Sequence, residues 1–140
     1  VSAIQRLINS LYLPDPIKAS SGHMVTAGLT VMSASDLCHL YVNDYKQFLG
    51  YRNTALLAID DLGMESERIM KYGQECYPIS ELLSYRYECR LFTIVTTNLP
   101  SSEVRPRYGD RMADRVNHMM QVVVMPDTNF RELSETYNPI

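Results

Sequence analysis

Cysteine is scarce in this sequence, and long apolar runs are missing. The three cysteines, Cys38, Cys76 and Cys89, are odd in number and widely spaced, so they fit neither a disulfide framework nor a zinc-binding pattern. No apolar run is long enough to cross a bilayer, and no basic segment followed by an apolar one opens the chain. We therefore expect a soluble, cytoplasmic protein with reduced thiols and no membrane partner.

Histidine and lysine are also in short supply. The histidines are scattered along the chain and suggest no metal site. The net charge of −3 gives no general attraction to nucleic acid, although it leaves room for a local basic patch. Most of the basic residues are arginines, and four of them fall within eleven residues: Arg105, Arg107, Arg111 and Arg115.

The order of apolar patterns predicts a mixed fold. Hydrophobic residues make up 46% of the chain, enough for one domain with a core. Helical spacing of apolar residues predicts helices over 1–11, 33–48, 78–87 and 107–119. Continuous apolar runs predict strands over 29–33, 55–59, 91–98 and 121–125, and the polar segment 63–76 predicts a loop with a helical turn. Strands that alternate with helices indicate an α/β fold with a parallel sheet.

Two adjacent carboxylates end the apolar run at 55–59, in the stretch LLAIDDLG. In parallel sheets, ligands bind beyond the carboxyl ends of the strands, where we expect Asp60 and Asp61 to lie. One carboxylate can hold a hydrated Mg²⁺ ion while its neighbour orients a water molecule. Taken alone, the pair also fits a turn cap at Asp61 beside a solvated Asp60. A phospho-acceptor site of the receiver type would need a later lysine, and none follows Lys71.

Two further motifs suit phosphate chemistry. Thr97 and Asn98 end the next predicted strand, and the Asn98 amide can bond both a terminal phosphate and an attacking water. An asparagine before Leu-Pro is also a common turn residue. Arg111 and Arg115 are four residues apart and share one helix face, and a guanidinium spreads the charge that develops on phosphate oxygens. The alternative is a solvated face paired with aspartates of the same helix.

Together these motifs resemble one known family. The chain contains, in this order, LLAIDDLG, SYRYE, TIVTTNLP, YGDRMADRV and NFR. This series is similar to that of the AAA+ ATPase module of DnaC/DnaI-type replicative helicase loaders, and it covers residues 1–131. The resemblance implies a P-loop NTPase fold, with a three-layer arrangement of a parallel sheet flanked by helices. Residues 132–140 are expected to form a C-terminal tail.

The resemblance also implies a role for each residue at the ends of the strands. Asp60 matches the Walker B carboxylate that faces Mg²⁺, and Asp61 matches the one that polarises the attacking water. Asn98 matches the sensor-1 residue, with Thr97 beside it in the nucleotide-binding set.

Three arginines match positions that contact nucleotide in the family. Arg115 is similar to the arginine finger, which acts on ATP held by the neighbouring subunit, and Arg111 lies one turn before it. Arg131 resembles the sensor-2 arginine. Tyr87, within RYE, is expected to pack rather than to take part in catalysis.

One element of the family is missing from this sequence. The Walker A loop, G-x-x-x-x-G-K-[ST], cradles the phosphates with backbone N–H groups and a lysine. None of the lysines fits it, because Lys18, Lys46 and Lys71 follow Ile, Tyr and Met. The first helix resembles the one that normally follows that loop. We therefore expect a fragment of a longer ATPase that lacks the loop and the strand before it.

The resemblance implies an ATP-dependent DNA replication protein. The intact protein would bind ATP and Mg²⁺ between subunits, self-associate through that site, and control the engagement of a replicative DNA helicase with single-stranded DNA. IstB-like transposition helper ATPases share the acidic pair and a similar sensor strand, so they are an alternative. A binding module that keeps the fold without hydrolysing ATP is the third.

The missing phosphate loop generates a direct prediction. Titration of this 140-residue chain with Mg·ATP in a calorimeter should show weak binding or none, because no lysine or glycine-rich loop grips the phosphates. A micromolar dissociation constant would contradict this expectation.

Overall fold

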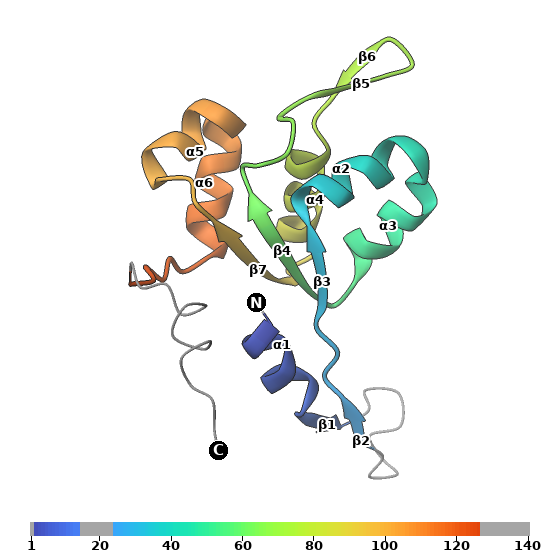
Figure 1. The fold of residues 1–140 in the computed structure, drawn as a ribbon, viewed down its shortest axis with the longest axis vertical. Coiled ribbons are helices and arrows are strands. Elements are labelled where there is room, and N and C mark those ends of the chain that lie inside the picture. Colours follow the sequence, from blue (N-terminus) through green and yellow to red (C-terminus); the bar gives the residue numbers. More distant parts are fainter. Residues whose placement is uncertain (1, 15–23, 127–140) are drawn as a thin grey trace, which may run out of the picture.

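The computed structural model describes residues 2–14 and 24–126, which form an α/β fold (Figure 1). Its centre is a parallel sheet of three strands in the order β3 (Thr30–Ser33), β4 (Leu56–Leu62) and β7 (Phe92–Thr97). Leu57 of β4 lies opposite Thr30 of β3 and Thr93 of β7. The predicted parallel sheet is confirmed, with β4 as its middle strand.

Five helices accompany the sheet: α2 (Ala34–Asn43), α3 (Tyr45–Asn53), α4 (Pro78–Glu88), α5 (Ser101–Tyr108) and α6 (Asp110–Met119). The predicted helix 33–48 is two helices that meet at Asp44. Its backbone N–H donates to the Leu40 carbonyl at the end of α2, and its carboxylate caps α3 by accepting the Gln47 N–H at 3.0 Å. The predicted helix 107–119 is interrupted at Gly109, whose φ of 83° leaves the helical region. Among the described helices, none combines the length and the apolar character needed to span a bilayer.

The hydrophobic core lies between the sheet and these helices. Leu57 and Ile59 of β4 are completely buried in it. Helices α2, α3, α4 and α6 each contribute at least one buried side chain, among them Leu37, Phe48, Leu82 and Met112. Burial of such side chains stabilises the fold by roughly 1.5–3 kcal/mol each.

Hydrogen bonds at Leu29 connect the amino-terminal helix to the segment that leads into β3. Helix α1 (Ser2–Asn9) is followed by a small antiparallel pair, β1 (Tyr12–Pro14) and β2 (Met24–Thr26). The Gln5 side chain donates to the Leu29 carbonyl at 3.2 Å, and the Leu29 N–H donates to Asn9 Oδ1 at 2.8 Å. Leu7 and Leu11 remain exposed.

Two sequence predictions are wrong. The segment 63–76 contains a hairpin, β5 (Ile69–Lys71) and β6 (Gln74–Cys76), since Tyr72 and Gly73 both take the positive φ values that a two-residue turn requires. The segment 121–125 is exposed and forms no strand. A run of valines becomes a strand only where another strand supplies hydrogen-bonding partners, and no described residue does so there.

A buried arginine joins three of these elements. Arg86 of α4 is fully inaccessible to solvent. Its guanidinium donates to the carbonyls of Arg52 and Thr54 at 2.9 and 2.7 Å, where α3 leads into β4. It also donates to the Phe92 carbonyl at 2.6 Å and the Thr93 hydroxyl at 2.9 Å, where β7 begins. Burial lowers the pKa of Arg86 from 12.5 to about 10, so the group is still a cation at neutral pH.

Replacing the Arg86 side chain should remove a large part of the protein's free energy of unfolding. Arg86→Met leaves buried carbonyl oxygens without donors, and we expect the free energy of unfolding in urea to fall by about 3–5 kcal/mol. The matched control is Arg111→Met, at an exposed arginine, which should change it by less than about 0.5 kcal/mol. Equal stability of the two variants would show that Arg86 does not hold these elements together.

Candidate functional site

The acidic pair lies inside strand β4 rather than beyond it. The pairing of β4 with β7 is regular up to Ile59 and resumes at Leu62, so Asp60 and Asp61 form a bulge between them. Asp61 has a φ of 56°, a left-handed conformation that aspartate adopts more readily than most residues. Bulges of this kind re-aim side chains at the end of a strand. Asp60 is half-buried, and Asp61 is exposed.

Thr96 connects this bulge to the neighbouring strand. Its hydroxyl donates a short hydrogen bond to Asp60 Oδ1 and accepts the backbone N–H of Asp61 at 3.0 Å. Thr96 was not among the residues predicted from the sequence, which pointed to Thr97. Side chains alternate along β7, so only one of the two threonines can face the acidic pair, and the bulge in β4 decides which one does.

Thr97 joins the end of β4 to the loop after β7. Its hydroxyl donates to the Leu62 carbonyl at 2.6 Å and accepts the Leu99 N–H at 3.0 Å. Asn98 lies between these contacts, exposed, directly after the end of β7. The structure therefore brings the ends of β4 and β7 together at one edge, which carries the acidic pair, both threonines and Asn98.

The residues at this edge fit a hydrated cation. Mg²⁺ keeps several water ligands and is usually held by one or two carboxylates together with substrate phosphates. In the described ranges, no group of three or more His, Cys, Asp or Glu side chains gathers to enclose a metal ion. Asp60 would hold the ion through its carboxylate, and Asp61 would orient water beside it.

A buried glutamate that the sequence analysis did not identify fixes the loop after β4. The Glu65 carboxylate accepts the Gly63 N–H at 2.7 Å and a hydrogen bond from the Tyr108 hydroxyl. The Arg107 guanidinium lies 3.7 Å from this carboxylate and donates to the Glu65 carbonyl. Burial, together with the hydrogen bond to Glu65, raises the pKa of Tyr108. This network ties the end of α5 to the loop that follows the acidic pair.

In the described part of the chain, some arginines of α5 and α6 form ion pairs with carboxylates and one does not. Arg105 forms ion pairs with Asp110 at 2.7 Å and Asp114 at 2.8 Å. The aspartates expected to pair with the helix arginines are thus taken by Arg105. Arg111 is exposed and makes no ion pair with any residue in the described part of the chain.

Arg115 lies away from the acidic pair of its own chain. Its side chain is only 13% exposed, is paired with Glu88 at 2.9 Å and lies over the Tyr87 ring. Glu88 ends α4, which leads into the start of β7, whereas the acidic pair faces the other end of that strand. Tyr87 also bonds His118 Nδ1 at 2.9 Å, in keeping with the packing role expected for it. Arg131 lies outside the described residues.

Gly63 allows the two loops of this edge to approach. Its φ is 101°, and a Cβ atom there would lie 2.5 Å from Cγ and Cδ1 of Leu99, next to Asn98. We expect Gly63→Ala to lower the free energy of unfolding by about 1–3 kcal/mol. In the control Gly50→Ala, the new Cβ meets nothing within 4 Å inside α3, and urea unfolding should show unchanged or slightly raised stability. If both variants were equally stable, the close approach at Gly63 would be unimportant.

No model of a known protein family matches this chain, and no curated protein shows significant sequence similarity to it. The geometry of the β4–β7 edge is therefore the structural basis for a functional proposal.

Proposed function

We propose that this chain carries the Walker B and sensor-1 half of an AAA+ ATPase site, in an ATP-dependent DNA replication protein of the helicase-loader kind. One observation supports the proposal above the others. The Thr96 hydroxyl donates to the Asp60 carboxylate and accepts the backbone N–H of Asp61, which holds the acidic pair beside β7, the strand that Asn98 directly follows. A turn cap would not need a hydrogen-bonded strand on each side, as β3 and β7 lie beside β4.

Each residue of the edge has a distinct task in this proposal. The Asp60 carboxylate, held by Thr96, would bind Mg²⁺, and the exposed Asp61 carboxylate would accept a hydrogen bond from the attacking water. The Asn98 amide would donate to the terminal phosphate. Mg²⁺, when bound, neutralises charge on the phosphate oxygens.

The arginine helix would serve a neighbouring subunit. Arg115 would stabilise charge on ATP bound by the next copy, and Arg111, one turn earlier, is already exposed. To do so, Arg115 must leave Glu88, whose side chain is 60% exposed. The Arg115 side chain is 13% exposed and lies over the Tyr87 ring, so the exchange gives up part of this packing as well as the ion pair.

The resemblance extends the proposal to partners. ATP state would control how the protein engages a replicative helicase and single-stranded DNA, and an IstB-like role beside a transposase uses the same site. A non-hydrolysing binding module with the same fold is the second candidate, and it predicts that the full-length protein also lacks a G-x-x-x-x-G-K-[ST] motif.

Substitution of the water-orienting carboxylate tests the catalytic proposal. In a protein that carries the Walker A loop ahead of Val1, Asp61→Asn should abolish phosphate release and leave calorimetric ATP binding largely intact. The control Asp36→Asn, at an exposed aspartate of α2, should keep full turnover. Full turnover in Asp61→Asn would exclude the proposed role.

Substitution of the finger residue tests the assembled site. Arg115→Ala should reduce hydrolysis only at protein concentrations where subunits associate, as followed by light scattering alongside phosphate release. An equal loss in monomers would show that Arg115 does not act across a subunit interface.

A further inference from the structure

Glu65 is a buried charge that has no role in the proposed hydrolysis. Its side chain is only 1% exposed, and the two oxygens of its carboxylate bind different elements. Oε2 accepts the Gly63 N–H at 2.7 Å, in the loop after β4. Oε1 accepts the hydroxyl of Tyr108, at the end of α5, and lies 3.7 Å from the Arg107 guanidinium. Because both oxygens belong to one planar group, a displacement of the loop also displaces Tyr108.

On the loop side, Glu65 supports the turn that contains Asp61. The Met64 N–H donates to the Asp61 carbonyl at 3.1 Å and closes this turn. Glu65 holds the same turn through the Gly63 N–H. Asp61 has a left-handed φ of 56°, and its own N–H donates to Thr96. The position of Asp61 is therefore set by Thr96 on one side and by the contact at Glu65 on the other.

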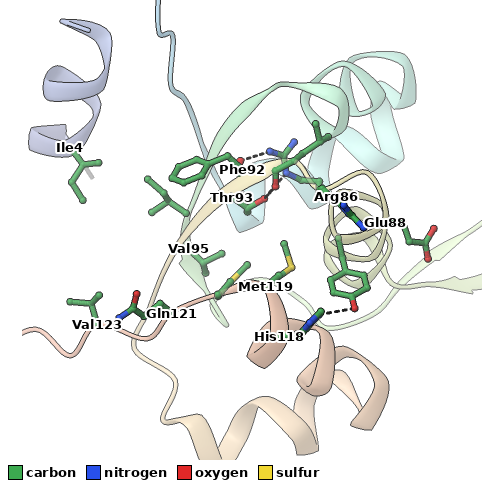
Figure 2. Close-up of a pocket in the computed structure, with 15 residues that line it drawn as sticks. Ile4, Arg86, Glu88, Phe92, Thr93, Val95, His118, Met119, Gln121 and Val123 are labelled. Carbon is green, nitrogen blue, oxygen red and sulfur yellow. Dashed lines mark hydrogen bonds between the residues drawn. The ribbon is translucent and has the colours of Figure 1, made fainter. Parts of the chain in front are cut away.

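On the helix side, Glu65 holds the point where α5 leads into α6. Tyr108 is the last residue of α5, and Gly109 follows with a φ of 83° before α6 begins. Such a residue between two helices absorbs a change in their relative orientation. The far end of α6 is held by a different contact, in which His118 bonds Tyr87 of α4 at 2.9 Å (Figure 2). A movement of Tyr108 is thus taken up as a rotation of α6 about Gly109.

Arg107 leaves this network incompletely satisfied. Its guanidinium donates to the Glu65 carbonyl, but its Nε–H is buried and has no acceptor among the described residues. A buried donor without a partner is unfavourable, so a rearrangement that supplied an acceptor would offset part of its own cost. This favours a second arrangement of the network once the loop after β4 moves.

We propose that Glu65 is a positioning residue that couples the acidic pair to helix α6. When the acidic pair binds a cation, the turn at Asp61 would shift, and Glu65 would transmit this shift through Tyr108. Helix α6 carries Arg111 and Arg115, so the arginines offered to a neighbouring subunit would change position with the occupancy of the chain's own site. The inference rests on the proposed function, because it takes the β4–β7 edge as a cation site.

Amide NMR of the full chain, titrated with Mg²⁺, tests the coupling. In the wild-type chain, signals of residues 61–63 and 110–115 should shift along one binding curve. Tyr108→Phe removes only the hydroxyl that joins α5 to Glu65. In this variant, residues 61–63 should still respond to Mg²⁺, while the shifts at 110–115 should fall at least fivefold. The control Tyr77→Phe removes a hydroxyl from another tyrosine–glutamate pair, at an exposed site, and should leave both responses unchanged.

Hydrogen exchange without added cation measures the same connection independently of the cation site. Tyr108→Phe should speed exchange of the Gly63 amide at least fivefold, because its acceptor is held less firmly. Unchanged exchange at Gly63 would overturn the coupling. So would Mg²⁺-dependent shifts at 61–63 with none at 110–115 in the wild-type chain, although the cation site would then stand. No shift at either segment would overturn the cation site itself, and with it the coupling.

Discussion

The buried guanidinium of Arg86 is the contact on which the arrangement of the sheet depends. It binds the carbonyls that precede β4 and the first residues of β7, so it fixes where the two strands start relative to each other. A shift of one residue in this pairing would exchange the two faces of β7. The register fixed at that end places Val95 opposite Ile59 and therefore brings Thr96 to the acidic pair at the other end.

The carboxyl edge of the sheet is held by hydrogen bonds from the two threonines of β7, which do not neutralise the charge of the acidic pair. Thr96 orients Asp60, and Thr97 joins the ends of both strands. The Glu65 carboxylate accepts a hydrogen bond from Tyr108 and forms an ion pair with Arg107. The acidic pair is thus fixed in position, and no basic side chain in the described ranges forms an ion pair with it. An acidic pair that is held in place and forms no ion pair is better suited to bind a cation than to serve as part of a structural salt bridge.

The sequence predicted the elements whose pattern is local and missed those that depend on a neighbour. The apolar runs at 55–59 and 91–98 predicted β4 and β7, and their order predicted that the strand ends would meet. The bulge that selects Thr96 over Thr97 depends on cross-strand pairing, which no local pattern reveals. The strand predicted at 121–125 needs a partner, and the contact of Arg115 with Glu88 joins helices that are distant in sequence.

Paramagnetic broadening of amide NMR signals, with Mn²⁺ in place of Mg²⁺, tests the proposed cation site on Asp60 at the β4–β7 edge. Signals of residues 60–63 and 96–98 should broaden first in the wild-type chain. Asp60→Asn should abolish this effect, while Asp36→Asn should leave it unchanged. Broadening at these amides that persists in Asp60→Asn, or that begins at other exposed carboxylates, would show that Asp60 binds no cation here.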